Sequence, residues 1–320
     1  MRRTGAMPSF LIIGNGYPAQ RVVETILQRD PACLTGLITA DAEGVGATRP
    51  CAEYGVAVAG PEALSRMVST GMPISSGNWL INANSTTVIS PPILQAFSGR
   101  ALNLHPGPLP EYAGLQVEQW AILNREAEFG ATIHFIESTI DTGPIVAQER
   151  FPITDRDTGL SLLTRAIQCG QRLLVQIVER LLAGEALQAR PQMLERRRLY
   201  RLSDALPGVI DWTKPAQWIV DFIRSRNYEP FVCPNGPAYL ESGSGDRIEL
   251  LRAVIGPVTS APPGTLLKTS GRDGVIAAGD GRAVTIVKAR AAFAAGSSST
   301  IDWTALASTG GALRPKHRPS

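Results

Sequence analysis

Short apolar runs alternate with amphipathic stretches along the first 150 residues. The apolar runs are typical of buried strands and span residues 10–13, 34–39, 79–83, 101–105 and 131–136. Between them, apolar residues recur at helical spacing and predict helices at 18–28, 61–68, 92–97 and 115–123. Pro18 would occupy the first helical position, where a missing N–H costs nothing. The alternation predicts an α/β domain with a doubly wound, mainly parallel sheet.

The pattern changes after residue 158. Apolar positions at helical spacing predict one long helix over 159–183, which Gly184 would end. A polar stretch over 185–208 is interpreted as a linker. Beyond it come a helix at 215–225 and short β-like runs at 238–241, 248–254, 264–267, 274–278 and 283–287. With a hairpin signal at Asp280-Gly281, these runs predict a small, OB-like β-barrel over 209–303 and a loose tail over 304–320.

Composition narrows the classes of function. Lys and Arg total 31 and Asp and Glu total 28, a balance of +3 that argues against a broad nucleic-acid surface. Four widely spaced cysteines and three histidines favour neither a disulfide framework nor a metal site. No apolar run approaches the length of a membrane span. We therefore expect a cytoplasmic enzyme without a metal, as a monomer or homodimer.

The sequence Gly14-Asn15-Gly16 follows the first predicted strand. It matches a dinucleotide-binding fingerprint only loosely, with Ala19 and Asp41 in the remaining positions. Glycines in a tight strand-to-helix turn explain it equally simply. We favour the turn.

A more informative segment begins at Asn103 and His105, two residues apart on a predicted strand, so that both side chains point to one face. They lie at the carboxyl end of that strand, where open α/β sheets bind ligands. Capping of backbone groups is the alternative for an isolated pair. Asp141 follows the strand 131–136 and reaches His105 if the two strands are neighbours. His134, on that strand, is interpreted as a core or supporting histidine.

The segments around Asn103 and Asp141 resemble the 10-formyltetrahydrofolate-dependent formyltransferases. That family carries Asn-x-His-Pro-Ser-Leu-Leu-Pro-x-Tyr-x-Gly and, further along, an Asp-Thr-Gly or Asp-Gly-Gly turn. The matching residues are Asn103, His105, Pro106, Leu109, Pro110, Tyr112, Gly114, Asp141, Thr142 and Gly143. Ile210-Asp211-Trp212 and the glycine turns over 263–281 are similar to the second domain of the two-domain type, which includes methionyl-tRNA formyltransferase. The resemblance implies a Rossmann-like catalytic domain over 9–184.

The resemblance also implies roles for individual residues. Asn103 and His105 would hold the oxyanion, and His105, tuned by Asp141, would assist proton transfer. The formyl donor would be 10-formyltetrahydrofolate, without a metal. The expected donor-binding residues are Ile81, Asn82, Ala83, Asn84, Ser85, Thr86, Thr139, Ile140, Thr142 and Gly143. The expected acceptor-binding residues are Gly107, Pro108, Leu109 and Tyr112.

Two departures from the family bear on the acceptor. Gly107 replaces the usual serine, and residues 41–50 hold one cation where methionyl-tRNA formyltransferases carry a long basic insert. A tRNA acceptor needs phosphate neutralisation, so we expect a small primary amine or hydroxylamine, such as an amino sugar or an ornithine-type siderophore or other secondary-metabolite precursor. Methionyl-tRNA is the alternative acceptor. Outside transferases, the alternatives are a formyltetrahydrofolate hydrolase or an inactive folate-binding module.

Overall fold

The computed structural model describes residues 7–40, 46–69, 78–241, 247–270, 273–291 and 303. Asp41 and the predicted tail 304–320, which contains His317, lie outside these ranges. The chain divides into two compact units. The first contains Met1–Val117, Glu128–Pro152 and Thr164–Tyr200, and the second contains Glu118–Ala127, Ile153–Leu163 and Arg201–Ser320. The predicted domain boundaries stay a prediction.

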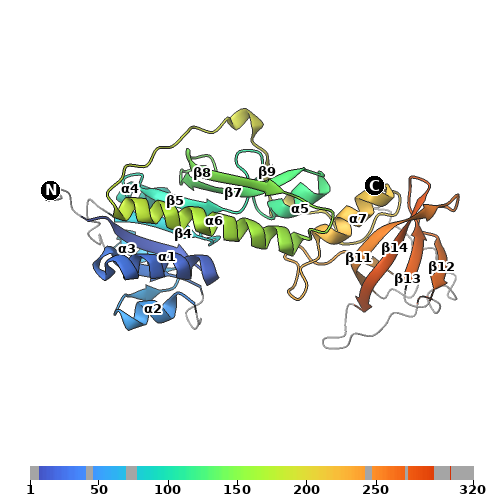
Figure 1. The fold of residues 1–320 in the computed structure, drawn as a ribbon, viewed down its shortest axis with the longest axis horizontal. Coiled ribbons are helices and arrows are strands. Elements are labelled where there is room, and N and C mark those ends of the chain that lie inside the picture. The colour runs from blue at the N-terminus through green and yellow to red at the C-terminus, as the bar shows by residue number, and fades with distance from the viewer. Residues whose placement is uncertain are drawn as a thin grey trace. The chain divides into compact units, whose positions relative to one another are not determined.

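The first unit is built on a seven-stranded sheet in the order β3-β2-β1-β4-β5-β7-β8. Its strands are β1 (Ser9–Gly14), β2 (Leu34–Ile38), β3 (Val58–Ala59), β4 (Asn78–Ala83), β5 (Ala101–His105), β7 (Glu128–Phe135) and β8 (Ile145–Pro152). The first five in this order pair in parallel, whereas β7 pairs in the antiparallel sense with both of its neighbours, β5 and β8 (Figure 1). The predicted mainly parallel α/β sheet is confirmed.

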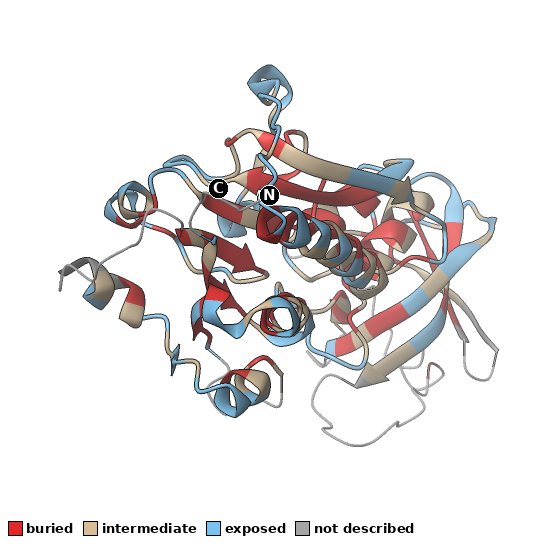
Figure 2. Cartoon of the chain, turned by 60° about the vertical axis from the view of Figure 1, so that its left-hand side comes forward, coloured by how far each residue is buried: buried red, intermediate tan, exposed pale blue. Residues whose placement is uncertain are grey.

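Helices cover both faces of this sheet. Alternate residues of β1 separate the two cores: Phe10 and Ile12 pack with α1 (Gly16–Arg29) and the second half of α6 (Gly159–Leu182). Leu11 and Ile13 pack with α3 (Ala63–Ser69) and α4 (Pro91–Ala96). The buried strands lie between these two layers (Figure 2). The unit also contains α2 (Thr48–Glu53) and the short strands β6 (Ala113–Gly114) and β9 (Leu199–Tyr200), which pair in parallel.

The turn after β1 has a structural explanation. The side-chain oxygen of Asn15 accepts hydrogen bonds from the Thr39 hydroxyl (2.9 Å) and the Ala40 N–H (3.0 Å), which ties the end of β1 to the end of β2. These contacts favour the turn interpretation of Gly14-Asn15-Gly16. One detail of the prediction is wrong, because α1 begins at Gly16 and Pro18 is its third residue. Proline is tolerated there because the N–H groups of a first helical turn have no partner within the helix.

The second unit contains a five-stranded antiparallel sheet in the order β10-β11-β14-β13-β12. Its strands are β10 (Tyr239–Glu241), β11 (Arg247–Val258), β12 (Leu266–Ser270), β13 (Asp273–Ala277) and β14 (Arg282–Ala291). Helix α7 (Ala216–Ser225) packs against the sheet through Ile219, Phe222 and Ile223. The hairpin predicted at Asp280-Gly281 is confirmed by the β13–β14 pairing. Closure into an OB-like barrel stays a prediction.

Helix α5 (Val117–Leu123) and α6 each run from one unit into the other, and short 3-10 turns complete the described structure. These turns are Pro31–Cys33, Leu194–Arg196 and Leu202–Asp204. Within the described ranges, no helix combines the length and apolar character needed to cross a bilayer.

Candidate active site

The pairing of β5 with β7 assembles the centre of the site. Asn103 lies directly opposite His134, and His105 lies opposite Thr132. Directly opposed residues in an antiparallel pair share a face of the sheet, and so do residues two apart on one strand. Four polar side chains therefore emerge together at the carboxyl end of β5. The strands β5 and β7 are neighbours, as the predicted approach of Asp141 to His105 requires.

Asp141 is held in an unusual backbone conformation in the turn that follows β7. Its φ is +56°, in the left-handed region that Asp tolerates better than most residues. Two residues later, a Cβ on Gly143 would lie 1.9 Å from the Phe135 carbonyl oxygen, so only glycine allows this close return of the chain. The Gly114 N–H donates to Asp141 Oδ2 at 2.8 Å. The turn thus delivers one carboxylate to a fixed position.

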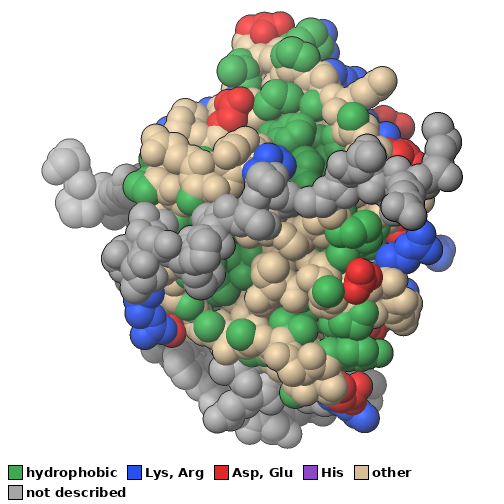
Figure 3. All heavy atoms as spheres, turned by 90° about the vertical axis from the view of Figure 1, so that its left-hand side faces the viewer, with side chains coloured by type: hydrophobic (Ala, Val, Ile, Leu, Met, Phe, Trp, Pro, Cys, Tyr) green, Lys and Arg blue, Asp and Glu red, His purple; other side chains and the backbone are tan. Residues whose placement is uncertain are grey.

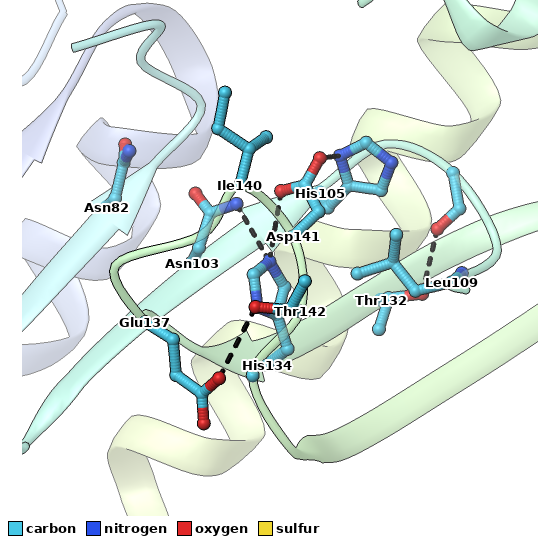
Figure 4. A network of polar contacts seen from close by, with 12 residues as sticks. Asn82, Asn103, His105, Leu109, Thr132, His134, Glu137, Ile140, Asp141 and Thr142 are labelled. Atoms are coloured by element: carbon cyan, nitrogen blue, oxygen red, sulfur yellow. Dashed lines mark hydrogen bonds and ion pairs between the residues drawn. The ribbon is translucent and has the colours of Figure 1, made fainter. Parts of the chain in front are cut away.

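The Asp141 carboxylate stands between two imidazoles (Figure 4). Its Oδ2 lies 3.6 Å from His105 Nδ1, and its Oδ1 lies 3.5 Å from His134 Nε2. Both histidines are buried. This arrangement makes His134 a member of the site rather than a distant core residue.

Backbone carbonyls fix which ring nitrogen of His134 carries hydrogen. His134 Nδ1 lies 2.7 Å from the Phe135 carbonyl oxygen, and a carbonyl only accepts, so Nδ1 donates. In the neutral ring, Nε2 is then an acceptor, and it receives the Asn103 amide Nδ2–H at 3.1 Å. The amide group of Asn103 retains a second N–H, which is free of this contact.

The same logic applies to His105. Its Nε2 lies 2.6 Å from the Tyr112 carbonyl oxygen and therefore donates to it. The remaining nitrogen, Nδ1, faces Asp141. A proton arriving on Nδ1 would produce an imidazolium flanked by a carbonyl and a carboxylate.

Burial and charge shift the pKa values of this pair. Burial by itself would raise the pKa of Asp141, but the charge of His105 and the hydrogen bond from the Gly114 N–H act against burial, and the pKa lies below its usual range. Burial lowers the pKa of His105 from its ordinary value, against the opposing effects of Asp141 and the Tyr112 carbonyl. The site at neutral pH therefore contains a carboxylate beside a neutral imidazole.

A buried network supports the loop that follows His105. The Thr132 hydroxyl donates to the Gly107 carbonyl at 2.8 Å and accepts the Leu109 N–H at 3.1 Å. Gln148 Nε2 donates to the Leu109 carbonyl at 2.7 Å and to the Thr132 hydroxyl at 2.9 Å. Thr132 is fully buried. The loop is therefore held from β7 and β8.

The expected donor-binding residues lie on two segments beside Asn103. Asn82 is the register partner of Asn103 in the β4–β5 pair, so residues 81–86 begin next to β5. The Asn82 amide binds both backbone groups of Ser85, at 3.0 and 3.1 Å, and Asn84 has a φ of +64°. The second segment is the Asp141 turn, which contains Thr139, Ile140, Thr142 and Gly143; Ile140 is exposed there. Their binding role stays a prediction.

The expected acceptor-binding residues lie in the supported loop. Leu109 and Tyr112 are buried, and the Tyr112 ring stacks on Tyr200 at a centroid distance of 5.4 Å. Gly107 and Pro108 are buried as well. A Cβ on Gly107 would lie 2.8 Å from His105 Nε2 and 3.0 Å from the Tyr112 carbonyl oxygen. The absence of a side chain at this position therefore protects the His105 hydrogen bond.

Sequence reasoning missed two contributors: the network of Thr132 with Gln148, and Gln192, whose Nε2 donates to the carbonyls of Asp141 and Gly143. For His134 it left a core role and a supporting role open. Thr132 and His134 alternate on one strand as Asn103 and His105 do on another, and that shared period of two was the available signal. In the part of the chain that the structure describes, no cluster of three His, Cys, Asp or Glu side chains is placed to hold a metal ion.

Part of the chain is similar to known formyltransferases. Residues 76–178 match the formyl transferase family. The chain is 35% identical over 182 residues to a methionyl-tRNA formyltransferase of Roseiflexus sp. (strain RS-1), and 32% identical over 179 residues to one of Synechococcus sp. (strain JA-3-3Ab). These matches cover 56% of this chain and 53% and 52% of the two relatives, so the chain aligns with about half of their length.

Solved structures show the same fold. An N-formyltransferase from Helicobacter canadensis, in complex with folinic acid and dTDP-3-aminofucose, superposes with a TM-score of 0.68 at 19% identity over 88% of this chain and 99% of its own. HypX from Aquifex aeolicus, in complex with tetrahydrofolic acid, gives 0.56 at 16% identity over 90% of this chain and 45% of its own.

The chain thus has two units, and a segment of about a third of its length, which includes the strands β4, β5, β7 and β8, is similar to the formyl transferase family.

Proposed function

We propose that this protein transfers a formyl group from 10-formyltetrahydrofolate to the primary amine or hydroxylamine nitrogen of a small molecule. The observation that carries the proposal is the grouping of Asn103, His105 and Asp141, with His134, at the end of β5 inside a formyl transferase domain. The proposed donor agrees with the folate compounds named with two structural relatives.

The site's groups match the needs of the reaction. The acceptor nitrogen attacks the formyl carbon, and the carbonyl oxygen takes on negative charge. The free N–H of Asn103 is available to that oxygen. The proton lost by the acceptor nitrogen passes to the Asp141–His105 pair, which can hold it on His105 Nδ1. When the bond to folate N10 breaks, that proton returns to N10, which yields the formylated acceptor and tetrahydrofolate.

The residues present are compatible with a folate donor, which would supply the reactive formyl group. The backbone of residues 84–86 and the exposed side chain of Ile140 lie on the two segments that adjoin Asn103. The Asn82 amide is already engaged with Ser85, so it would shape this binding segment rather than bind the donor itself.

The preferred acceptor is an amino sugar carried on a nucleotide. The Helicobacter canadensis enzyme was crystallised with dTDP-3-aminofucose, and the structural match spans 99% of that chain. The surface drawn in Figure 3 shows Lys and Arg side chains in small groups next to Asp and Glu rather than in one broad basic patch. Methionyl-tRNA is the second candidate, because the sequence relatives with 32–35% identity are methionyl-tRNA formyltransferases.

Incubation with 10-formyltetrahydrofolate tests the proposal. Release of tetrahydrofolate is followed with nucleotide-linked amino sugars, with ornithine-type hydroxylamines, with charged initiator tRNA and without acceptor, and formylated products are identified by mass. Release that depends on a small amine is the expected result. Release without acceptor would indicate a hydrolase, no release a binding module, and release only with charged tRNA the second candidate.

A further inference from the structure

Residues 190–200, here called the strap, belong to the stretch that the sequence suggested was a linker. In the structure they are bound along the first unit. The backbone of Arg190 exchanges two hydrogen bonds with Ile145 at the start of β8. The Arg198 carbonyl accepts the Ala113 N–H at 3.0 Å, and the Tyr200 carbonyl accepts the Leu115 N–H at 3.0 Å. The strap is thus fixed at both ends.

Between these ends, two strap side chains bind the backbone of the Asp141 turn. Gln192 Nε2 donates to the Gly143 carbonyl at 2.7 Å and to the Asp141 carbonyl at 3.1 Å. Arg197 Nη2 donates to the Ile140 carbonyl at 2.6 Å. A primary amide has two N–H groups on one nitrogen, which suits two convergent carbonyls. The strap therefore satisfies three carbonyls of one short turn.

The two side chains that make these contacts each leave one buried polar atom unpaired within the described structure, which destabilises the folded state. Gln192 Oε1 and Arg197 Nε are buried without a hydrogen-bond partner among the described residues. Leaving a buried polar atom unpaired is unfavourable, and such atoms in native proteins call for an explanation. The turn offers one, because Asp141 sits at a φ of +56°, a conformation that persists only where the surroundings impose it.

We propose that Gln192 is a positioning residue that holds the Asp141 turn so that the carboxylate faces His105. This inference rests on the proposed function only in assigning the pair a catalytic use. Gln192 binds the backbone that follows the Asp141 side chain, at the carbonyls of Asp141 and Gly143, whereas Arg197 binds the carbonyl that precedes it. Without it, the turn relaxes toward ordinary backbone angles and the carboxylate moves away from the imidazole.

Histidine titration by NMR tests this directly. The chain has three histidines, so each ring proton can be assigned with single substitutions at His134 and His317. The groups that face His105 are Asp141, His134 and the Tyr112 carbonyl, and among these the Asp141 charge raises the pKa of His105. In Gln192→Met, which has similar length and no N–H, the His105 signal should titrate at lower pH than in the wild type.

Activity supplies a second readout. In Gln192→Met, kcat should fall by about 10- to 100-fold with KM little changed, because misplacement of a reacting group affects the transition state most. Met193→Ala, at an exposed neighbouring strap position, is the matched control and should leave both readouts at wild-type values. If the methionine variant does not fold, Gln192→Asn replaces it in both measurements. Its side chain is one methylene shorter, so its amide should not reach both carbonyls, and the same changes are expected.

A folded Gln192→Met protein with an unchanged His105 titration would overturn the inference. Equal effects of Met193→Ala and Gln192→Met would overturn it as well, since the strap as a whole would then be responsible. Because the titration needs neither donor nor acceptor, its outcome stays separate from any failure of the formyl transfer assay.

Discussion

At the scale of single residues, the orientation of one amide decides what the site can do. The Phe135 carbonyl sets the hydrogen on His134, and His134 in turn directs the Asn103 nitrogen toward itself. One N–H of Asn103 is then left for a developing oxyanion. Neither the tautomer nor the direction of the amide is encoded in the spacing of Asn103 and His105. They follow from the register of β5 against β7.

Removal of the Asn103 amide should therefore affect the chemical step. In Asn103→Ala, kcat should fall by about 10²–10³-fold, the typical cost of one oxyanion donor. Single-turnover formyl transfer measures this step. Arg49→Ala on α2, where the arginine side chain is 77% exposed, is the control. A near wild-type rate in the alanine variant would contradict the role given to Asn103.

The lowered pKa of His105 gives the proposed reaction a predictable pH dependence. Burial lowers the pKa of His105 below its ordinary 6.5, so the ring stays neutral and able to accept a proton down to that lower pH. The acid limb of kcat should therefore lie below pH 6.5. The pH dependence of kcat is measured with two acceptors whose amines differ in pKa. A limb that moves with the acceptor comes from the substrate, and one that stays in place comes from the enzyme. An acid limb above pH 6.5 with both acceptors would contradict the assignment to His105.

Loss of the Asp141 charge should move that limb. Asp141→Asn removes the carboxylate that raises the pKa of His105, so the limb should shift to lower pH and kcat should fall by about 10²–10⁴-fold. The same single-turnover series measures both effects. A limb that stays in place in Asp141→Asn would show that the two groups do not interact.

Gly107 has a clear steric reason to lack a side chain. In Gly107→Ala, the new Cβ would press on His105 Nε2 and the Tyr112 carbonyl, which it would approach within 2.8 and 3.0 Å. We expect kcat to fall by about 10- to 100-fold through displacement of His105. Gly46→Ala, where a Cβ meets nothing closer than 3.8 Å, should have little effect. Equal rates for the two variants would remove this explanation.

At the scale of elements, burial decided what the sequence could predict. The strands β1, β4 and β5 are buried on both faces, and most of their residues are apolar. Strand β8 was not predicted, because only Ile145 among its eight residues is buried and its sequence looks like a polar loop. An apolar run does not encode the direction of its strand. The sequence therefore could not predict that β7 runs antiparallel to its neighbours β5 and β8.

The Thr132 network allows a test of how elements support the loop. Thr132→Val keeps the shape of the side chain and leaves the Leu109 N–H without its hydroxyl partner in a buried place. Unfolding should become easier by about 1–3 kcal/mol. Denaturant titration measures the change. Thr35→Val, an exposed site whose hydroxyl also binds backbone, should change stability by under about 0.5 kcal/mol.

At the scale of the whole molecule, the chain divides into two compact units, and the polar composition of residues 185–208 did not reveal that part of this stretch binds the first unit. The strap makes up about half of the suggested linker over 185–208. Its polar side chains and its backbone form hydrogen bonds with the first unit. A polar segment that binds a folded surface looks the same in sequence as one that does not. The grouping of Asn103, His105 and Asp141 could nevertheless be predicted, because these residues lie in two short motifs, and their catalytic role stays a prediction.

The second unit contains a buried acid that should make stability depend on pH. Burial raises the pKa of Glu118, against the hydrogen bonds from Tyr228 and its own backbone. A carboxyl with a raised pKa in the folded state stabilises fully below its unfolded value, 4.5, and this contribution is lost as pH rises through the folded pKa. As the pH rises above 4.5, the protein therefore loses this contribution, because the carboxyl ionises more easily in the unfolded chain than in the buried site.

Glu118→Gln should remove this loss of stability, because an amide does not ionise. Its oxygen can still accept the hydrogen bond from the Tyr228 hydroxyl. The variant should melt at a higher temperature than the wild type above pH 7, by ~2–4 °C for each kcal/mol gained, and the difference should shrink toward pH 4. Thermal melts across this range are the measurement, with the exposed Glu128→Gln as control. A constant difference at all pH values would contradict the assignment.

The two units also share the chain in an interleaved way that matters for engineering. Segments Glu118–Ala127 and Ile153–Leu163 belong to the second unit, although first-unit sequence stands on both sides of each. A fragment ending at residue 200 would keep these segments and lose what they bind, including Tyr228 for Glu118 and Asn227 for Leu160. A graft that exchanges second units between relatives should therefore carry both segments with it, which makes the exchange a three-piece splice.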